Sequence, residues 1–250
     1  MSNFRIIFLA ILLELGCVTS AYSEETILIG VSDWPPYLAQ NLQYNGIAAQ
    51  VIRESFASEG FKTELSFLPW KRAYKSAERG DLAGTFGWGW RADRVKHFYY
   101  SDNVFDSKQV FFHLKKYKFD WKSVVDLEGI SIGGTIGYKY EKKFDDAEKA
   151  GKLYVDRALS DHHNFKKLVS GRIDIFPMEI AGGIEMLIRE YGPGIMELVT
   201  YHPKPLVVEP IFLLISRKNK DNKRILESFN KGLRTLKSNG TYDQYFDDLY

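Results

Sequence analysis

Residues 84–102 read GTFGWGWRADRVKHFYYSD and combine small, flat and cationic side chains. Glycine lets a backbone come close to a ligand, tryptophan offers a flat apolar surface, and Arg94 offers a planar fork of donors suited to a carboxylate. In an extended segment, Trp88 and Trp90 point to the same side. Glycine and tryptophan also alternate in ordinary strands, so the segment is either one wall of a site for a small anion or part of a packed core.

The composition is that of an ordinary globular protein. The chain has 250 residues, of which 45% are hydrophobic and 26% charged, enough for one large domain or two small ones. Its net charge is only +2, and the two signs are mixed along the chain, so we expect no nucleic-acid partner. Aromatic residues make up 15%, more than a core of this size needs, and we expect some of them to line a binding cleft.

The N-terminus has the pattern of a secretory signal peptide. Arg5 precedes an apolar run over residues 6–13, and Ala21-Tyr22-Ser23 approximates the small-x-small pattern of a cleavage site. The run is too short to span a bilayer, and Glu14 interrupts it, so a retained anchor is the weaker interpretation. We therefore expect a signal peptide over residues 1–23, cleavage after Ser23, and a periplasmic destination.

Cys17 is the only cysteine and lies within this expected signal peptide. Cleavage after Ser23 would leave the mature protein without a thiol or a disulfide. The alternative is a lipoprotein anchored through Cys17. It is less favoured because Glu14 stands where a lipobox has an aliphatic residue.

Strands and helices alternate along residues 24–110. Strands are expected at residues 26–31, 65–67 and 82–86, and helices at 47–59 and 71–79. Short units in this order predict a mostly parallel sheet covered by helices. Pro35 and Pro36 fix an extended loop just beyond the carboxyl end of the first strand, which is where ligands bind in open α/β sheets.

A second α/β unit follows. Strands are expected at residues 109–113, 130–133, 153–155, 173–176, 196–200 and 211–215, and helices at 138–150, 161–170, 180–191 and near the C-terminus. The basic and aromatic stretch 115–122 marks one crossing between the units, and Pro203 with Pro205 marks another. We expect one lobe from residues 24–110 and 208–250, a second from 111–207, and a ligand cleft between them.

Several motifs in order give a resemblance to a known family. They are Trp34-Pro35-Pro36-Tyr37, Arg94 six residues before Tyr100-Ser101, Leu127-Glu128-Gly129, Gly171-Arg172-Ile173-Asp174, and Asn230-Lys231-Gly232-Leu233 followed by Gly240-Thr241-Tyr242. Each motif is weak alone, but together and behind a signal peptide they are specific. The chain resembles family 3 of the bacterial extracellular solute-binding proteins, the periplasmic amino-acid-binding type, over nearly its whole mature length.

The resemblance implies a type II periplasmic-binding-protein fold, whose two lobes close on a ligand by hinge motion. In such proteins the arginine that matches Arg94 pairs with the α-carboxylate of the ligand. Aromatic residues that match Trp34 and Trp70 flank the ligand side chain, and Glu179 matches the acidic residue that holds the α-ammonium. The resemblance also implies an amino-acid-like or carboxylate-bearing ligand, an inner-membrane ABC permease as partner, a monomer, and no cofactor or metal.

The chain departs from the family pattern at three places. Arg91 replaces a frequent threonine, Tyr138 and Lys139 replace hydroxyl residues at a helix start, and Glu179 replaces an aspartate. We also expect Trp88 and Gly89 to line the ligand site. The departures add positive charge and aromatic surface near the expected site, so the prediction is a ligand richer in negative charge or aromatic surface than a neutral amino acid.

Two other functions stay open. A periplasmic enzyme of this fold, similar to cyclohexadienyl dehydratases, is disfavoured because the chain has no Gly-x-Ser-x-Gly or His-Glu-x-x-His motif. Asp161-His162-His163 is expected to be a helix cap followed by solvated histidines. A sensory protein that docks to a membrane receptor cannot be told from a transport protein by sequence, because both use the same closing clamp.

Overall fold

The computed structural model of the chain describes residues 25–247. The expected signal peptide, with Cys17, lies outside these residues. The strands are β1 (Glu25–Val31), β2 (Phe61–Phe67), β3 (Gly84–Trp88), β4 (Phe98–Tyr100), β5 (Phe105–Leu114), β6 (Ile132–Thr135), β7 (Val155–Ala158), β8 (Ile175–Glu179), β9 (Val199–Tyr201) and β10 (Val207–Ser216). The α-helices are α1 (Ile47–Ala57), α2 (Trp70–Arg79), α3 (Lys142–Lys149), α4 (Asp161–Val169), α5 (Ile180–Tyr191), α6 (Asn222–Ser238) and α7 (Thr241–Asp247).

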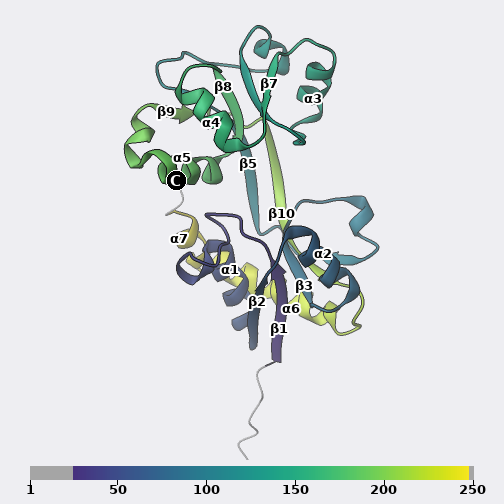
Figure 1. Cartoon of the computed structure of the whole chain (residues 1–250). Coiled ribbons are helices and arrows are strands. Elements are labelled where there is room, and N and C mark those ends of the chain that lie inside the picture. The colour runs from purple at the N-terminus through teal and green to yellow at the C-terminus, as the bar shows by residue number, and fades with distance from the viewer. Residues whose placement is uncertain (1–24, 248–250) are drawn as a thin grey trace, which may run out of the picture.

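These elements form two lobes connected by the long strands β5 and β10 (Figure 1). The first lobe contains β1 to β4, α1, α2, α6 and α7, and the second contains β6 to β9 and α3 to α5. The strand order is β2-β1-β3-β10-β5-β8-β6-β7, with β4 beside β10 and β9 beside β5. The alternating α/β pattern and the two-lobed arrangement expected from the sequence are therefore confirmed.

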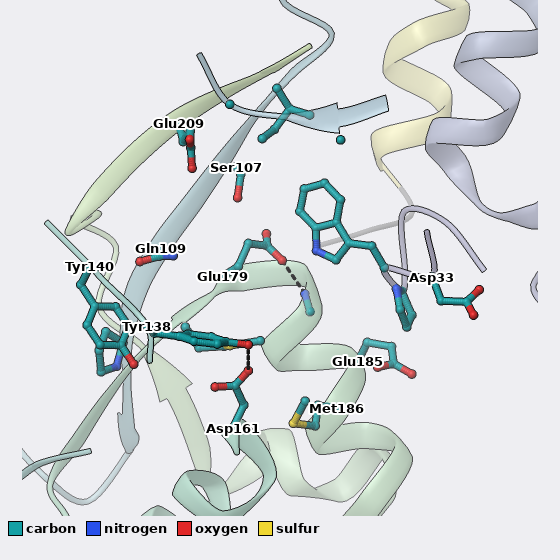
Figure 2. A pocket seen from close by; sticks show the side chains of 18 of the residues that line it. Asp33, Ser107, Gln109, Tyr138, Tyr140, Asp161, Glu179, Glu185, Met186 and Glu209 are labelled. Atoms are coloured by element: carbon teal, nitrogen blue, oxygen red, sulfur yellow. Dashed lines mark hydrogen bonds between the residues drawn. The ribbon is translucent and has the colours of Figure 1, made fainter. Parts of the chain in front are cut away.

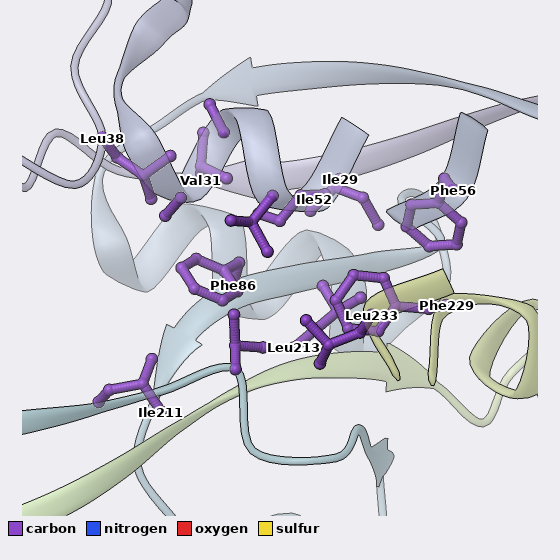
Figure 3. Packing of buried hydrophobic residues seen from close by; sticks show 14 of the residues in the cluster. Ile29, Val31, Leu38, Ile52, Phe56, Phe86, Ile211, Leu213, Phe229 and Leu233 are labelled. Carbon is purple, nitrogen blue, oxygen red and sulfur yellow. The ribbon is translucent and has the colours of Figure 1, made fainter. Parts of the chain in front are cut away.

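The first lobe has a core formed from both ends of the chain. Its inward residues on β1 and β3, such as Ile29 and Phe86, pack with Phe56 of α1 and Phe229 of α6 (Figure 3). All four side chains are buried. Helices α1 and α6 lie so close that a Cβ at Gly232 would stand 1.8 Å from the carbonyl oxygen of Ser55, so only glycine fits there.

The second lobe has a core on each face of its sheet. Phe111 and Phe112 are neighbours on β5, and a strand directs neighbouring side chains to opposite faces. Phe112 packs against Phe165 and Phe176 on one face, whereas Phe111 packs against Phe144 on the other. Both faces of this sheet are therefore covered by helices or loops. The sheet is mixed, because β6 pairs parallel with β7 and β8 whereas β5 pairs antiparallel with β8, β9 and β10.

The crossings between the lobes are made by strands. Phe105, the first residue of β5, belongs to the core of the first lobe, whereas Phe112 belongs to the second. Strands β5 and β10 pair antiparallel from Val207 opposite Gln109 to Ile211 opposite Phe105. Both strands are longer than the sequence predicted, because their mutual pairing continues through the crossing. The crossings therefore lie within these strands and not at residues 115–122 and 203–205. The expected lobe limits at residues 110 and 207 fall inside β5 and at the start of β10.

Two local expectations differ from the structure. The helix expected at residues 138–150 begins at Lys142, because Glu141 is its N-cap and accepts hydrogen bonds from the backbone N–H groups of Lys143 and Phe144. The residues before it, including Tyr138, form a turn beside the cleft. The second difference is β4, a three-residue strand that the sequence did not predict and that pairs with β10.

Candidate ligand-binding cleft

A cavity of about 530 Å³ lies between the lobes and beside the crossing strands (Figure 2). Its lining comes from the loop after β1, the start of α2, the end of β3, strands β5, β8 and β10, the segment after β6, the start of α4, and α5. The lining residues are Asp33, Trp34, Pro35, Trp70, Gly87, Gly89, Ser107, Gln109, Tyr138, Tyr140, Asp161, Pro177, Met178, Glu179, Gly182, Glu185, Met186, Arg189, Glu209 and Ile211. A cleft of this size between two lobes is a favoured place for a small ligand.

Trp34 and Trp70 form an apolar wall of this cavity on the first lobe. Their ring centroids lie 6.1 Å apart in an edge-to-face arrangement. A Cβ at Gly87 would stand 2.8 Å from the ring of Trp70, and Gly87 also has a φ of +96°. Glycine is required at this position for both reasons, because a side chain would strain the backbone and displace the indole.

Glu179 lines the cavity at the point where β8 ends and α5 begins. It is the N-cap of α5 and accepts hydrogen bonds from the backbone N–H groups of Ala181 and Gly182. The hydroxyl of Tyr37, from the other lobe, donates to its Oε1 atom at 2.8 Å. Sequence reasoning missed this bond between the lobes, although Tyr37 ends the Trp-Pro-Pro-Tyr motif.

The carboxyl group of Glu179 is buried without a cation. Glu179 is 8% exposed, and its carboxyl group forms no ion pair within residues 25–247. Burial raises the pKa of Glu179, and its three hydrogen bonds oppose that rise only partly. A buried carboxylate at a cavity wall provides a binding site for a cationic group.

Tyr138 and Asp161 meet on the second lobe. The phenol of Tyr138 donates to Oδ2 of Asp161 at 3.3 Å, and the hydroxyl of Thr135 donates to its other oxygen. Burial and the neighbouring Asp161 raise the pKa of Tyr138. Asp161 was expected to cap α4, but Ser160 is the cap and accepts from the backbone N–H of His163. Asp161 is instead a wall residue of the cavity.

The cavity is acidic. Five of its lining residues carry a carboxylate and one carries a guanidinium, Arg189. Both oxygens of Glu185 accept hydrogen bonds from Nη1 of Arg189, at 2.7 and 2.8 Å, so this cation is already paired. Arg91 and Lys139, on which the expectation of an anionic ligand rested, do not belong to the lining. The charge of this cavity therefore favours a cationic group on the ligand.

Arg94 lies beside the cleft, in a separate basic hollow on the first lobe. The hollow is lined by Lys71, Tyr74, Lys75, Glu78, Trp88, Arg91, Asp93, Arg94, Lys96 and His97. The Nη1 group of Arg94 donates to the carbonyl oxygen of Gly89 at 2.7 Å, and its guanidinium lies 4.8 Å from the ring centroid of Trp88. Arg94 thus contacts the backbone that lines the cleft without lining the cleft itself.

The structure brings together most of the residues that the sequence singled out. Trp34, Trp70, Gly89, Tyr138 and Glu179 line the cavity. Trp88 and Arg94 line the basic hollow, and Lys139 lines neither. The direct contacts predicted for these three residues stay predictions.

The described part of the chain gives two further findings. None of its helices has the length and apolar character that a membrane span requires. Within residues 25–247, no three or more His, Cys, Asp or Glu side chains converge to hold a metal ion.

Comparisons with known proteins agree with the two-lobed fold. A family model described as bacterial extracellular solute-binding proteins, family 3, matches residues 27–248. A search of curated protein sequences gave no match. Among solved structures, the second substrate-binding domain of GlnP from Lactococcus lactis, in an open conformation, has a TM-score of 0.73 and 19% identity, with 91% of this chain and 96% of that chain covered.

Two other solved structures are similar. The second substrate-binding domain of a putative amino acid ABC transporter from Streptococcus pneumoniae has a TM-score of 0.71 and 17% identity, covering 89% of this chain and 99% of that one. An ancestral arginine-binding protein bound to arginine has a TM-score of 0.65 and 22% identity, covering 91% and 99%. At these identities the likeness shows the fold.

Proposed function

Because the chain belongs to family 3 of the bacterial extracellular solute-binding proteins, we propose that it captures a small amino-acid-like solute between its lobes for an ABC-type uptake system. The observation that supports this most is Glu179, a buried carboxylate without a cationic partner at the wall of the cleft. An α-ammonium group would supply the missing charge and donate hydrogen bonds to it.

The remaining walls define the body of the ligand. Trp34 and Trp70 offer flat apolar surface, and such rings also attract cations. Asp161 and Glu209 add negative charge, so an extra carboxylate on the ligand would meet repulsion. The ligand in this proposal is therefore an amino acid with an apolar or cationic side chain. Of the two alternatives expected from the sequence, it keeps the aromatic or apolar surface and replaces the added negative charge.

A thermal-shift screen with matched probes tests the proposal. Each amino acid is compared with its α-hydroxy acid, which lacks only the ammonium group. We expect stabilisation by amino acids alone, and ligand at about 100 times its dissociation constant adds roughly 2.7 kcal/mol. Stabilisation by the hydroxy acids to the same degree would contradict the role of Glu179.

A pair of variants assigns that effect to the charge. Glu179→Gln keeps the shape but removes the charge, and should weaken binding of the best probe by roughly 2 to 5 kcal/mol. Tyr37→Phe removes one hydrogen bond to the same carboxylate and keeps the charge, so its loss should be smaller, about 1 kcal/mol. Equal losses in both variants would show that the geometry of Glu179 matters more than its charge.

The proposal also includes export and cleavage of the signal peptide. We expect the protein in the periplasm, as a monomer, with Glu24 as the first residue after removal of residues 1–23. Mass spectrometry of the periplasmic fraction checks this, and a lipidated N-terminus at Cys17 would contradict it.

Binding without turnover separates this function from that of an enzyme. The best probe incubated with purified protein should be recovered unchanged by NMR. Co-purification with a permease, and not with a receptor, would separate uptake from sensing.

A further inference from the structure

Two polar side chains on β5 face the cleft without a protein partner. Ser107 is 9% exposed and lines the cavity, and its hydroxyl forms no hydrogen bond to any residue within 25–247. Gln109 also lines the cavity, and its Oε1 atom is buried and accepts no hydrogen bond from the described residues. Buried polar atoms are nearly always satisfied in a folded protein, so the buried Oε1 atom of Gln109 indicates a ligand group that completes it, and the unpaired hydroxyl of Ser107 lines the same cavity.

Strand register places two carboxylates beside them. Ser107 and Gln109 are two residues apart, so they share one face of β5. Glu209 of β10 is opposite Ser107, and Glu179 of β8 is opposite Gln109. Directly opposed side chains lie on the same face of a sheet, and Figure 2 shows all four around one space.

Glu209 holds a charge that no protein cation neutralises. It forms no ion pair or hydrogen bond with the described residues. Its carboxylate lies against the end of β3, where a Cβ at Gly89 would stand 1.7 Å from its Oε1 atom. The missing side chain at Gly89 therefore leaves room for this carboxylate beside Ser107 and Gln109.

We propose that Ser107, Gln109 and Glu209 form a subsite on the crossing strands for a second cationic nitrogen of the ligand. All three offer acceptors, and the nearby carboxylate requires positive charge, so a primary ammonium or a guanidinium fits. This subsite rests on the proposed function, because Glu179 holds the first ammonium. Two strand spacings and two residues separate the Cα atoms of Glu179 and Glu209 by about 12 Å, so the ligand is an extended dication.

Matched pairs of probes test the second charge. Lysine is compared with norleucine, and 1,5-diaminopentane with pentylamine; each pair differs chiefly in the terminal ammonium. Isothermal titration calorimetry on the whole purified protein should show a preference of about tenfold or more for the dication. In Glu209→Gln the preference should fall toward one, and in Ser107→Ala it should fall by about threefold.

Asp106→Asn is the matched control. Asp106 precedes Ser107 on β5 and has an exposed side chain outside the cavity lining, so the same loss of charge should leave the preference unchanged. Thermal melting of each variant shows that it is folded.

Each outcome decides the question. Equal binding of lysine and norleucine, or a preference that survives in Glu209→Gln, overturns the subsite and leaves the proposed function standing. A preference seen only with the diamine pair supports the subsite and contradicts an amino-acid ligand. Failure of all four probes to bind overturns the subsite, because both dications carry the groups it requires.

Discussion

Two neighbouring hollows on this protein carry opposite charge. The cleft between the lobes has five carboxylates and one guanidinium, whereas the basic hollow on the first lobe has five Lys and Arg side chains and two carboxylates. The segment that ends β3 separates them: Gly87 and Gly89 line the cleft, and Trp88 lines the basic hollow. A net charge of +2 for the whole chain therefore says nothing about the charge of the ligand.

The end of β3 therefore contributes residues to both the cleft and the basic hollow. Alternation directs the indole of Trp88 away from the cleft and leaves glycine backbone on the other side. The guanidinium of Arg94 lies against this indole in the basic hollow and donates a hydrogen bond to the carbonyl oxygen of Gly89. Arg94 thus supports the wall of the cleft from outside. Four predictions test this division.

Ligand affinity should fall as the pH is lowered from neutral. Burial raises the pKa of Glu179, so this carboxylate destabilises the unliganded protein above that pKa, and the destabilisation is relieved as the pH falls through it. Ammonium binding requires the charged form and is lost over the same window, up to roughly 2 to 5 kcal/mol. Calorimetry at a series of pH values measures this. Glu179→Gln should show a nearly flat profile, and an equal slope in that variant would refute the assignment.

Gly87→Ala should displace Trp70 from the wall of the cleft and destabilise the protein. The new Cβ would stand 2.8 Å from the indole in a backbone with φ of +96°. Gly129→Ala is the control, because Gly129 has φ of +81° but no atom within 4 Å of a Cβ. Urea unfolding should show Gly87→Ala less stable than the control by about 1 to 3 kcal/mol. Equal stability would mean that Trp70 moves freely.

Arg94→Ala separates two roles for this residue. A support for Gly89 predicts a loss of about 1 to 2 kcal/mol in the unfolding free energy of the unliganded protein, from a charged hydrogen bond and a contact with Trp88. A direct carboxylate anchor predicts unchanged unliganded stability and a large loss of affinity. The observed contacts favour the first result. Urea unfolding and calorimetry on the same variant distinguish them.

Neutralising the basic hollow should have the smallest effect. Lys71→Gln with Lys96→Gln removes two exposed charges that line the hollow and not the cleft. Salt screens exposed charges over about 8 Å at physiological ionic strength, so ligand affinity should change by less than about threefold. A tenfold change measured by calorimetry would place the hollow in contact with the ligand.

The sequence predicted the fold well because its signals are local or ordered. The helix expected at residues 180–191 matches α5. Trp34, Trp70 and Glu179, which line the cavity, were predicted from family motifs. Side-chain alternation also applied to β3, but a period of two does not tell which face meets the cleft. Trp88 and Arg94 were therefore expected on the cleft side.

The other missed residues depend on contacts between distant segments. The bond from Tyr37 to Glu179 joins residues 142 positions apart, and no local pattern indicates it. Ser107, Gln109 and Glu209 lie on strands whose extension through the crossing was not predicted. Their common face appears only once β5, β8 and β10 are paired in register.

The core of the first lobe has a consequence for how the chain is made. Strand β1 and helix α1 come from the first residues of the described chain, whereas Phe229 and Leu233, which fill the same core, come from α6 near its end. This lobe stays incomplete until almost the whole sequence has emerged. The second lobe lies between these segments in the sequence, so during synthesis the N-terminal elements of the first lobe remain without their full core until the second lobe has been made.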